Sequence, residues 1–441
     1  MADQFLNADF GNLLPSSQLS ITPAILISSF FLSVYRANAA YNPPTTDDVR
    51  TQYDFIVVGS GSAGSVVTNR LSENPDFKVL LLEAGGEATE TTEIPLYAGL
   101  AFRSELDWNY TLAPSSQYCL GMIDNTCYYV KGKGLGGTSI VNTMLYVRGN
   151  KKDFDDWADA GNYGWSFEDV LPYFKKSEDN RNKEFSKNER FHSTGGELTV
   201  SDISWKTPLA DPFVAAGSEL GYPEGDFNAE NQADSFNQRF PVGFKFKITG
   251  YGVTFLTDKN VTFRGDRYAN SIANMTTILT RQLYNTRYLP IEEKEAFTII
   301  LALIQPKSVG RISLQSKNPF DQPVIDVNYF AEEDDVRRLV DGTKLAIKLM
   351  ETKAVEHLNI KYHYVPIPLC PNAVPLSDEY FECLMRYEPI PFYHTTGGAK
   401  MGPKSDPTAV VDPQLRVRGF LARVVDVNNA KLYLEIPIQQ L

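Results

Sequence analysis

The sequence contains no unbroken run of about twenty apolar residues, which excludes a protein that crosses a membrane several times. Basic residues are also in deficit, because 42 Lys and Arg stand against 54 Asp and Glu and give a formal net charge of −12. This acidic balance argues against a general nucleic-acid binder, which would present a basic face. The four cysteines and four histidines form no CxxC pair and no histidine cluster, so the pattern predicts no metal site.

Apolar residues are abundant enough for sizeable cores. Hydrophobic residues make up 43% of the 441 residues and aromatic residues 12%, which excludes wholesale disorder. At roughly 150 residues per domain, this length predicts about two or three domains.

The one long apolar run near the amino terminus covers residues 21–35 and is followed by Ala37-Asn38-Ala39. An apolar run of this length before a small-x-small tripeptide is typical of a secretory signal peptide. We therefore expect residues 1–39 to be a signal peptide and the mature protein to be secreted. Because no Lys or Arg precedes the run, a buried amphipathic segment or an uncleaved anchor remains the alternative.

The cysteines and three glycosylation sequons agree with an oxidising compartment. The short spacings favour two disulfides, Cys119–Cys127 and Cys370–Cys383. The sequons begin at Asn109, Asn260 and Asn274.

Past the leader, the pattern predicts a βαβ unit. Residues 53–58 (YDFIVV) are a short apolar run, which predicts a strand buried on both faces. A helix over 63–72 and a second strand over 78–83 follow. Later elements are a helix over 166–178 capped by Ser166, strands over 309–316 and 322–330, and a long helix over about 331–352.

A glycine fingerprint joins the first strand to the first helix. Gly59 permits a tight turn, Gly61 lets the backbone approach a pyrophosphate, and Gly64 lets the helix pack on the sheet. The helix amino terminus attracts phosphates, and Glu83, at the end of the second strand, is placed to accept hydrogen bonds from a ribose. The spacing alone does not separate FAD from NAD. The predicted dinucleotide contacts in this unit are Gly59, Gly61, Ser62, Ala63, Gly64, Glu83 and Ala84.

A second glycine-rich segment, residues 132–149, is far more distinctive, with four glycines and two hydroxyl residues among 132–139. Together with Glu83-Ala84-Gly85-Gly86 and the run 156–174, residues 132–155 resemble the glucose–methanol–choline (GMC) oxidoreductase family, and in particular its insect glucose-dehydrogenase-like members. The resemblance covers about 50–426. It implies FAD as the cofactor, with contacts along its pyrophosphate and flavin from Gly136, Gly137, Thr138, Ser139, Asn142 and Met144.

Near the carboxyl end, residues 392–403 resemble the family's active-site histidine segment. The resemblance implies that His394 is the catalytic base and that Asp426, in the strand-like run 423–426, lies near the cofactor. A neutral imidazole is able to take the hydroxyl proton of an alcohol while hydride passes to the flavin. The other histidines, His192, His357 and His363, match no motif and are assigned to surface or core.

The expected fold is α/β: a Rossmann-like FAD-binding domain with a second, α+β substrate domain built on a mostly antiparallel sheet. The expected domains are the FAD-binding domain over 50–230, shortened near 233–251, the substrate domain over 251–390, and a return to the FAD-binding domain over 391–441. The predicted substrate is an alcohol or sugar, with a quinone-type electron acceptor, no nucleic acid, and no stable membrane span beyond the leader.

Three departures from the family pattern are visible. The family's second signature is absent where residues 233–251 bridge its flanks, residues 427–441 lack the expected Asn or His partner of the first histidine, and the usual cysteine is Ala399. A chain that lacks strands of a doubly wound sheet exposes unpaired edges. A catalytically impaired flavin-binding variant therefore remains an alternative function, and an NAD-dependent dehydrogenase is a less favoured one.

Overall fold

The computed structural model describes segments that together span most of the chain: residues 52–93, 101–142, 144–202, 207–222, 224–230, 249–257, 280–291, 294–391 and 396–419, with the single residues 49, 99, 259 and 394. The expected leader, the sequons at Asn260 and Asn274, most of the bridge 233–251, and Asp426 lie outside the described residues.

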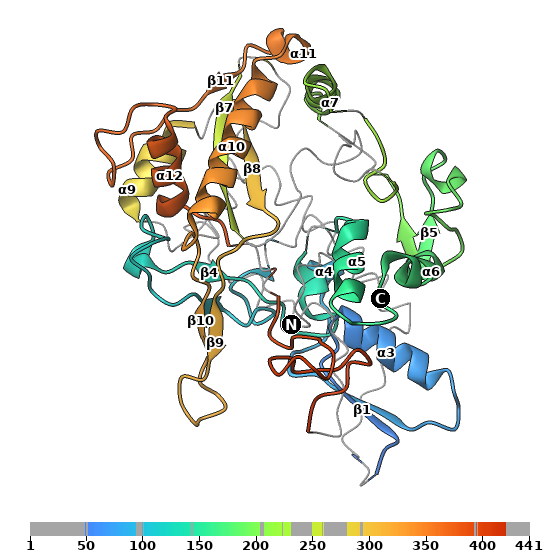
Figure 1. Cartoon of the computed structure of the whole chain (residues 1–441). Helices are drawn as coiled ribbons and strands as arrows, with labels where there is room; N and C mark the ends of the chain where they lie inside the picture. Colours follow the sequence, from blue (N-terminus) through green and yellow to red (C-terminus); the bar gives the residue numbers. More distant parts are fainter. Residues whose placement is uncertain are drawn as a thin grey trace, which may run out of the picture.

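The predicted βαβ unit is present. Strand β1 (Phe55–Val58) leads into helix α3 (Ser62–Ser72), and strand β2 (Val79–Leu82) returns parallel to β1, with Phe55 opposite Val79 and Val58 opposite Leu82. Figure 1 shows α3 lying beside β1, and α3 contacts both strands.

The prediction that the first strand is buried on both faces was wrong. Of its residues only Val57 is buried, whereas Val58 is 81% exposed and Ile56 is 59% exposed. Within the described residues β1 has one sheet neighbour, β2. An apolar run shows only that a strand tolerates burial. Whether the strand is buried depends on helices or strands from other parts of the chain that cover its two faces.

Beyond this unit, two helices carry an aromatic core. Helix α5 (Lys151–Asp159) and helix α6 (Phe167–Ser177) both begin with a capping box, and the second is capped by Ser166 as predicted. Their buried faces contribute Phe154, Trp157 and Phe174 to a cluster that also holds Met401 and Val411 from the carboxyl-terminal segment. The Trp165 indole nitrogen also donates to the Pro413 carbonyl over 2.8 Å. Residues 401–413 therefore pack back onto the amino-terminal half.

The largest hydrophobic core lies between an antiparallel sheet and the helices that pack on it (Figure 1). Strands β7 (Thr249–Leu256), β8 (Ala296–Leu303) and β11 (Lys361–Tyr362) form an antiparallel sheet in the order β11-β7-β8. Helix α10 (Glu333–Met350) packs on this sheet, with acidic residues in its first turn that favour the helix dipole. The two strands predicted over 309–316 and 322–330 are present as β9 (Arg311–Ser313) and β10 (Val324–Asp326), shorter than expected and paired antiparallel.

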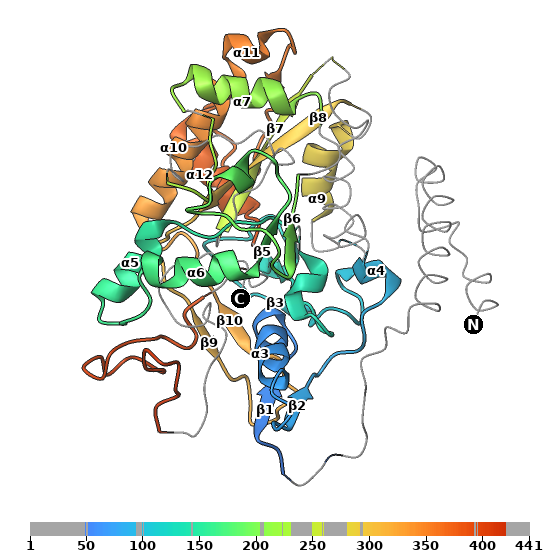
Figure 2. The same ribbon diagram turned by 90° about the vertical axis from the view of Figure 1, so that its right-hand side faces the viewer.

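The remaining helices and strands are short, apart from α7 (Ala210–Glu219) and α12 (Asp378–Tyr387), and one face of α12 is buried in the largest core. Figures 1 and 2 show the molecule in two views a quarter turn apart. In both views α7 and α11 (Lys353–Glu356) lie at the opposite end of the molecule from β1. These elements are α4 (Glu90–Glu93), β3 (Tyr110–Thr111), β4 (Tyr128–Tyr129), β5 (Glu178–Asn180), β6 (Leu198–Val200), α7 (Ala210–Glu219), α9 (Arg281–Leu283), α11 (Lys353–Glu356) and α12 (Asp378–Tyr387).

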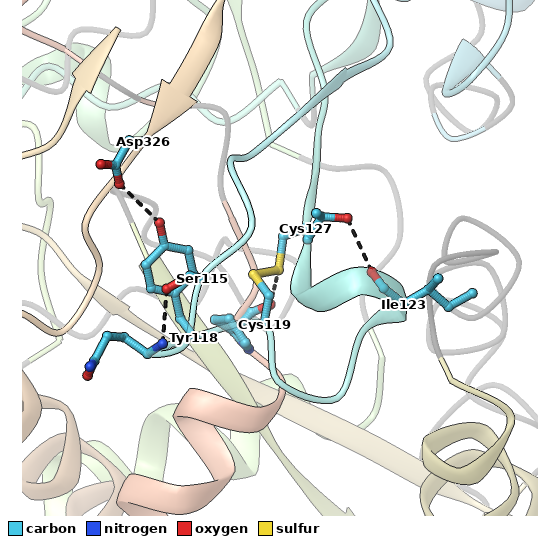
Figure 3. Close-up of a disulfide and its surroundings, with 9 residues drawn as sticks. Ser115, Tyr118, Cys119, Ile123, Cys127 and Asp326 are labelled. Carbon is cyan, nitrogen blue, oxygen red and sulfur yellow. Dashed lines mark hydrogen bonds between the residues drawn. A yellow bond between two sulfur atoms is a disulfide. The ribbon is translucent and has the colours of Figure 1, made fainter.

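Both predicted disulfides are present, Cys119–Cys127 and Cys370–Cys383. Figure 3 shows the first of them closing a loop beside Tyr118, whose hydroxyl donates to Asp326 over 3.4 Å. The sequon residue Asn109 is exposed. Within the described segments, no helix is both long and apolar enough to cross a bilayer.

Candidate functional site

The first glycine turn has the conformation that its sequence predicts. Gly59 has a φ of +91°, in the region that favours glycine. A Cβ atom on Gly64 would lie 2.0 Å from the Gly59 carbonyl oxygen, so the start of α3 packs directly on the turn. Gly59 and Gly64 are therefore required by the fold itself.

The second glycine segment lies on the first. The Gly136 nitrogen donates to the Ser60 carbonyl over 3.0 Å, and Gly61 and Gly136 form a parallel bridge. A Cβ atom on Gly137 would lie 2.8 Å from the Cα atom of Gly61. Two stretches about seventy-five residues apart in the sequence thus form one surface of bare backbone.

Glu83 fixes the first turn from the end of β2. One carboxylate oxygen accepts from the Ser60 nitrogen over 2.8 Å and from the Ser60 hydroxyl over 2.7 Å, and the other accepts from the Gly85 nitrogen over 2.7 Å. Partial burial alone would raise the pKa of Glu83, but these hydrogen bonds outweigh it and hold the pKa below its ordinary value. An ionised carboxylate only accepts hydrogen bonds, so a ribose hydroxyl that reached Glu83 would donate to it.

The turn fits the diphosphate of a dinucleotide. Cβ atoms on Gly59 and Gly61 would meet nothing within 4 Å, so the backbone there faces open space. No side chain caps the amino terminus of α3, which leaves its first N–H groups and the positive end of its dipole for an anion. A cavity of about 640 Å³ begins beyond the carboxyl end of β2 and is lined by residues 84–89, Glu105, Leu106 and Lys133. Ligands of open α/β sheets bind at this end of the strands.

Residues that the resemblance assigns to the flavin side follow along the second segment. Thr138 and Ser139 lie in a short 3₁₀ turn, Gly137–Val141, where the Ser139 hydroxyl donates to the Gly136 carbonyl over 2.6 Å. The Asn142 side chain accepts from the Met144 nitrogen over 2.8 Å, and Met144 is exposed with a φ of +57°. Contact of these residues with a flavin stays a prediction.

His394 is half-buried on a loop that leaves the carboxyl end of α12. The Cys119–Cys127 loop holds the start of this segment, because the Gly121 nitrogen donates to the Tyr387 carbonyl over 2.8 Å. The disulfide loop and α12 therefore position the chain a few residues before His394. Its role as a base stays a prediction, as does that of Asp426, which lies outside the described residues.

Comparison with known proteins identifies the family. Residues 53–248 and 306–427 match the amino-terminal and carboxyl-terminal family models of the GMC oxidoreductases. Glucose dehydrogenase (FAD, quinone) of Drosophila pseudoobscura pseudoobscura is 30% identical over 517 positions, which cover 86% of this chain and 83% of that protein.

The chain belongs to the GMC oxidoreductase family.

A second relative of this GMC oxidoreductase is an alcohol dehydrogenase (acceptor) of Pseudomonas putida, 27% identical over 85% of this chain and 91% of that protein. Among solved structures, a formate oxidase of Aspergillus oryzae RIB40 superposes with a TM-score of 0.66 at 18% identity, covering 90% of this chain and 96% of that one. The predicted fold, an FAD-binding α/β domain with a second α+β domain, is confirmed. The predicted cofactor, FAD, and the oxidoreductase class are confirmed at the level of the family.

The Drosophila relative also contains residues that this GMC oxidoreductase lacks. The alignment runs over 517 positions and this chain has 441 residues, so at least 76 positions of the alignment (517 minus 441) have no counterpart here.

Sequence reasoning missed two groups of residues in this GMC oxidoreductase. Ser60 is buried and gives Glu83 two hydrogen bonds, and its place between Gly59 and Gly61 was the available signal. The other group is a buried ionic network that begins at the end of the second glycine segment. The sequence gives no signal for it, because its members are far apart along the chain. They are Arg148, Glu178, His192 and Asp226.

Proposed function

We propose that this GMC oxidoreductase oxidises a CH–OH donor, an alcohol or a sugar, with His394 as the base that removes the hydroxyl proton. The observation that carries the proposal is the seating of the Gly136–Gly137 backbone on the Ser60–Gly61 turn. FAD, when bound, accepts the hydride that leaves the donor carbon. The two glycine stretches would hold its diphosphate, and the α3 amino terminus would offset the phosphate charge.

The roles of the side chains follow from their positions. Glu83, held at the end of β2 by Ser60 and Gly85, would orient the ribose by accepting from its hydroxyls. His394, on a loop held by α12 and the disulfide loop, would take the proton at a ring nitrogen. Asp426 would lie near the cofactor, as the resemblance implies.

The proposal also covers the electron acceptor of the enzyme and the compartment in which the protein works. The Drosophila relative is named for a quinone, and we propose a quinone-type acceptor for this chain as well. Secretion is supported by the two disulfides, which persist in oxidising compartments, and by the exposed sequon residue Asn109.

A second candidate function is flavin binding with impaired turnover. It is favoured by the exposed apolar side chains of β1 and by the alignment positions that this chain lacks. We place the missing block at residues 233–251, where the family's second signature would fall.

One experiment separates the two. The purified full chain, loaded with FAD, is mixed anaerobically with glucose, choline or a primary alcohol while flavin absorbance is followed. Bleaching by a donor, reversed faster by a quinone than by oxygen, supports the dehydrogenase. Retained FAD that no donor reduces supports the impaired flavin-binding protein, and a chain that takes up no FAD contradicts both.

A further inference from the structure

A buried ionic network lies directly beyond the second glycine segment. Arg148 is 1% exposed, Glu178 is 0% exposed and His192 is 3% exposed. An Arg148 guanidinium nitrogen lies 2.8 Å from the Glu178 carboxylate. The two His192 ring nitrogens lie 3.0 Å from Glu178 and 2.6 Å from Asp226. Four segments distant in the sequence therefore meet through charged side chains.

The geometry favours the cationic form of His192. Each ring nitrogen faces a carboxylate, and only an imidazolium has a proton to donate from both. Asn180 also approaches Nδ1, at 3.0 Å, but its amide has the Glu178 carboxylate as an alternative acceptor at 3.2 Å. With His192 charged, two cations and two anions balance. With His192 neutral, one buried negative charge is left uncompensated.

This network anchors a stretch that has no regular structure of its own. Residues 144–150 form neither helix nor strand. Asn228 accepts from the Arg148 nitrogen over 2.9 Å and donates to the Tyr146 carbonyl over 3.0 Å, while the Arg148 side chain donates to the Phe191 carbonyl. The path of the chain just after Asn142 and Met144 is thus set by these side-chain contacts.

We propose that His192 is a positioning residue for the cofactor: as a cation between Glu178 and Asp226, it holds Arg148 and thereby the end of the second glycine segment. The inference rests on the proposed cofactor site, because it concerns the segment that would lie along FAD. His192 itself touches neither cofactor nor substrate.

Because the network depends on the charge of His192, we expect FAD to be held less tightly as the pH rises. Burial alone would lower the pKa of His192, but its hydrogen bonds to Asp226 and Glu178 outweigh this and raise the pKa above the ordinary 6.5. The contribution of cationic His192 to holding Arg148 is therefore fully present below pH 6.5. It is lost as the pH rises through the raised pKa of His192.

The other charged and titratable groups of this region are Tyr146 and two ion pairs. Burial raises the pKa of Tyr146 to about 12, so its hydroxyl stays neutral. Asp179, which is partly buried, pairs with the exposed Arg181, and the exposed Arg190 pairs with the exposed Glu168.

The test is the rate of FAD release from the loaded full chain between about pH 5 and about pH 9, followed by flavin fluorescence after dilution. We expect wild-type release to accelerate about tenfold as the pH rises. His192→Gln should release FAD at the fast rate throughout. The matched control is His357→Gln, at an exposed histidine, which should behave as wild type.

Asp226→Asn is the second variant, at a carboxylate that is partly exposed and so milder to change. It should keep the transition but move its midpoint to lower pH, because one anion that stabilises the imidazolium is gone. An unmoved midpoint, or a His192→Gln profile like that of wild type, overturns the proposal. A lower melting temperature of the His192→Gln apoprotein with an unchanged release profile would show a structural role alone and also overturns it.

The proposed function fails separately, since FAD release needs no donor. A chain that holds FAD with the expected pH profile but oxidises nothing keeps this inference and contradicts the dehydrogenase. A wild-type chain that takes up no FAD overturns both.

Discussion

Gly137 lies against Gly61 so closely that a Cβ atom on Gly137 would be 2.8 Å from the Gly61 Cα atom. The contact joins the two halves of the proposed cofactor cradle. Gly137 also has a φ of +54°, in the left-handed region. Both the close approach and the backbone conformation therefore act against any side chain at this position.

Gly137→Ala should separate the two glycine segments. We expect the FAD dissociation constant to rise at least about tenfold and the free energy of unfolding to fall by about 1–3 kcal/mol. Fluorescence titration with FAD and urea unfolding measure the two effects.

The matched control is Gly164→Ala, where φ is +86° but a Cβ atom would meet nothing within 4 Å. It should lose some stability through backbone strain and keep its FAD affinity. If both variants bind FAD as wild type does, the contact between Gly137 and Gly61 does not shape the cofactor site.

Glu83→Gln should weaken the first turn. The carboxylate accepts from Ser60 and Gly85, and an amide would turn its NH₂ group toward one of these donors. We expect FAD affinity to fall about tenfold at neutral pH, since a hydrogen bond to a charged group contributes about 1.5–3 kcal/mol.

The stability difference between wild type and Glu83→Gln should depend on pH. Because the folded pKa of Glu83 is depressed, its contribution is present above the ordinary 4.5 and is lost as the pH falls through the depressed value. Urea unfolding at several pH values should therefore show the two curves converging in acid. A constant difference down to the acid limit would contradict an ionised Glu83 as the stabilising form.

These sites also show what the sequence was able to predict. The Ser166 cap depends on residues three positions apart, and the βαβ unit on the patterns of one continuous stretch, residues 55–82. The contact between Gly137 and Gly61 joins segments that are distant in the sequence. Only the resemblance to the GMC family indicated that both segments bind the same ligand, FAD. The burial of β1 and the His192 network depend on which layers and segments meet, which no local pattern records.

His394→Ala tests the proposed base. We expect the rate of flavin reduction by a donor to fall at least about 10²-fold while FAD stays bound, because a positioned base contributes about 10² to 10⁴ in rate. Anaerobic stopped-flow absorbance measures it. His357→Ala, at an exposed histidine, is the control and should reduce at the wild-type rate. Unchanged reduction in His394→Ala would refute the assignment.

The exposed face of β1 gives a matched pair of substitutions. Val57 is buried and Val58, the next residue, is 81% exposed. Val57→Thr should lower the free energy of unfolding by about 1–3 kcal/mol, because it buries a hydroxyl group. Val58→Thr keeps the branched shape and the strand preference, and should change the free energy by less than about 0.5 kcal/mol.

Urea unfolding of both variants decides whether the face of β1 that carries Val58 is open to solvent. Equal losses would mean that Val58 is covered in solution as Val57 is. The face would then be covered, and the exposed apolar side chains of β1 would no longer favour the impaired flavin-binding protein. A loss confined to Val57→Thr would keep that second candidate in place, because a two-stranded parallel pair is a weak support for a nucleotide site.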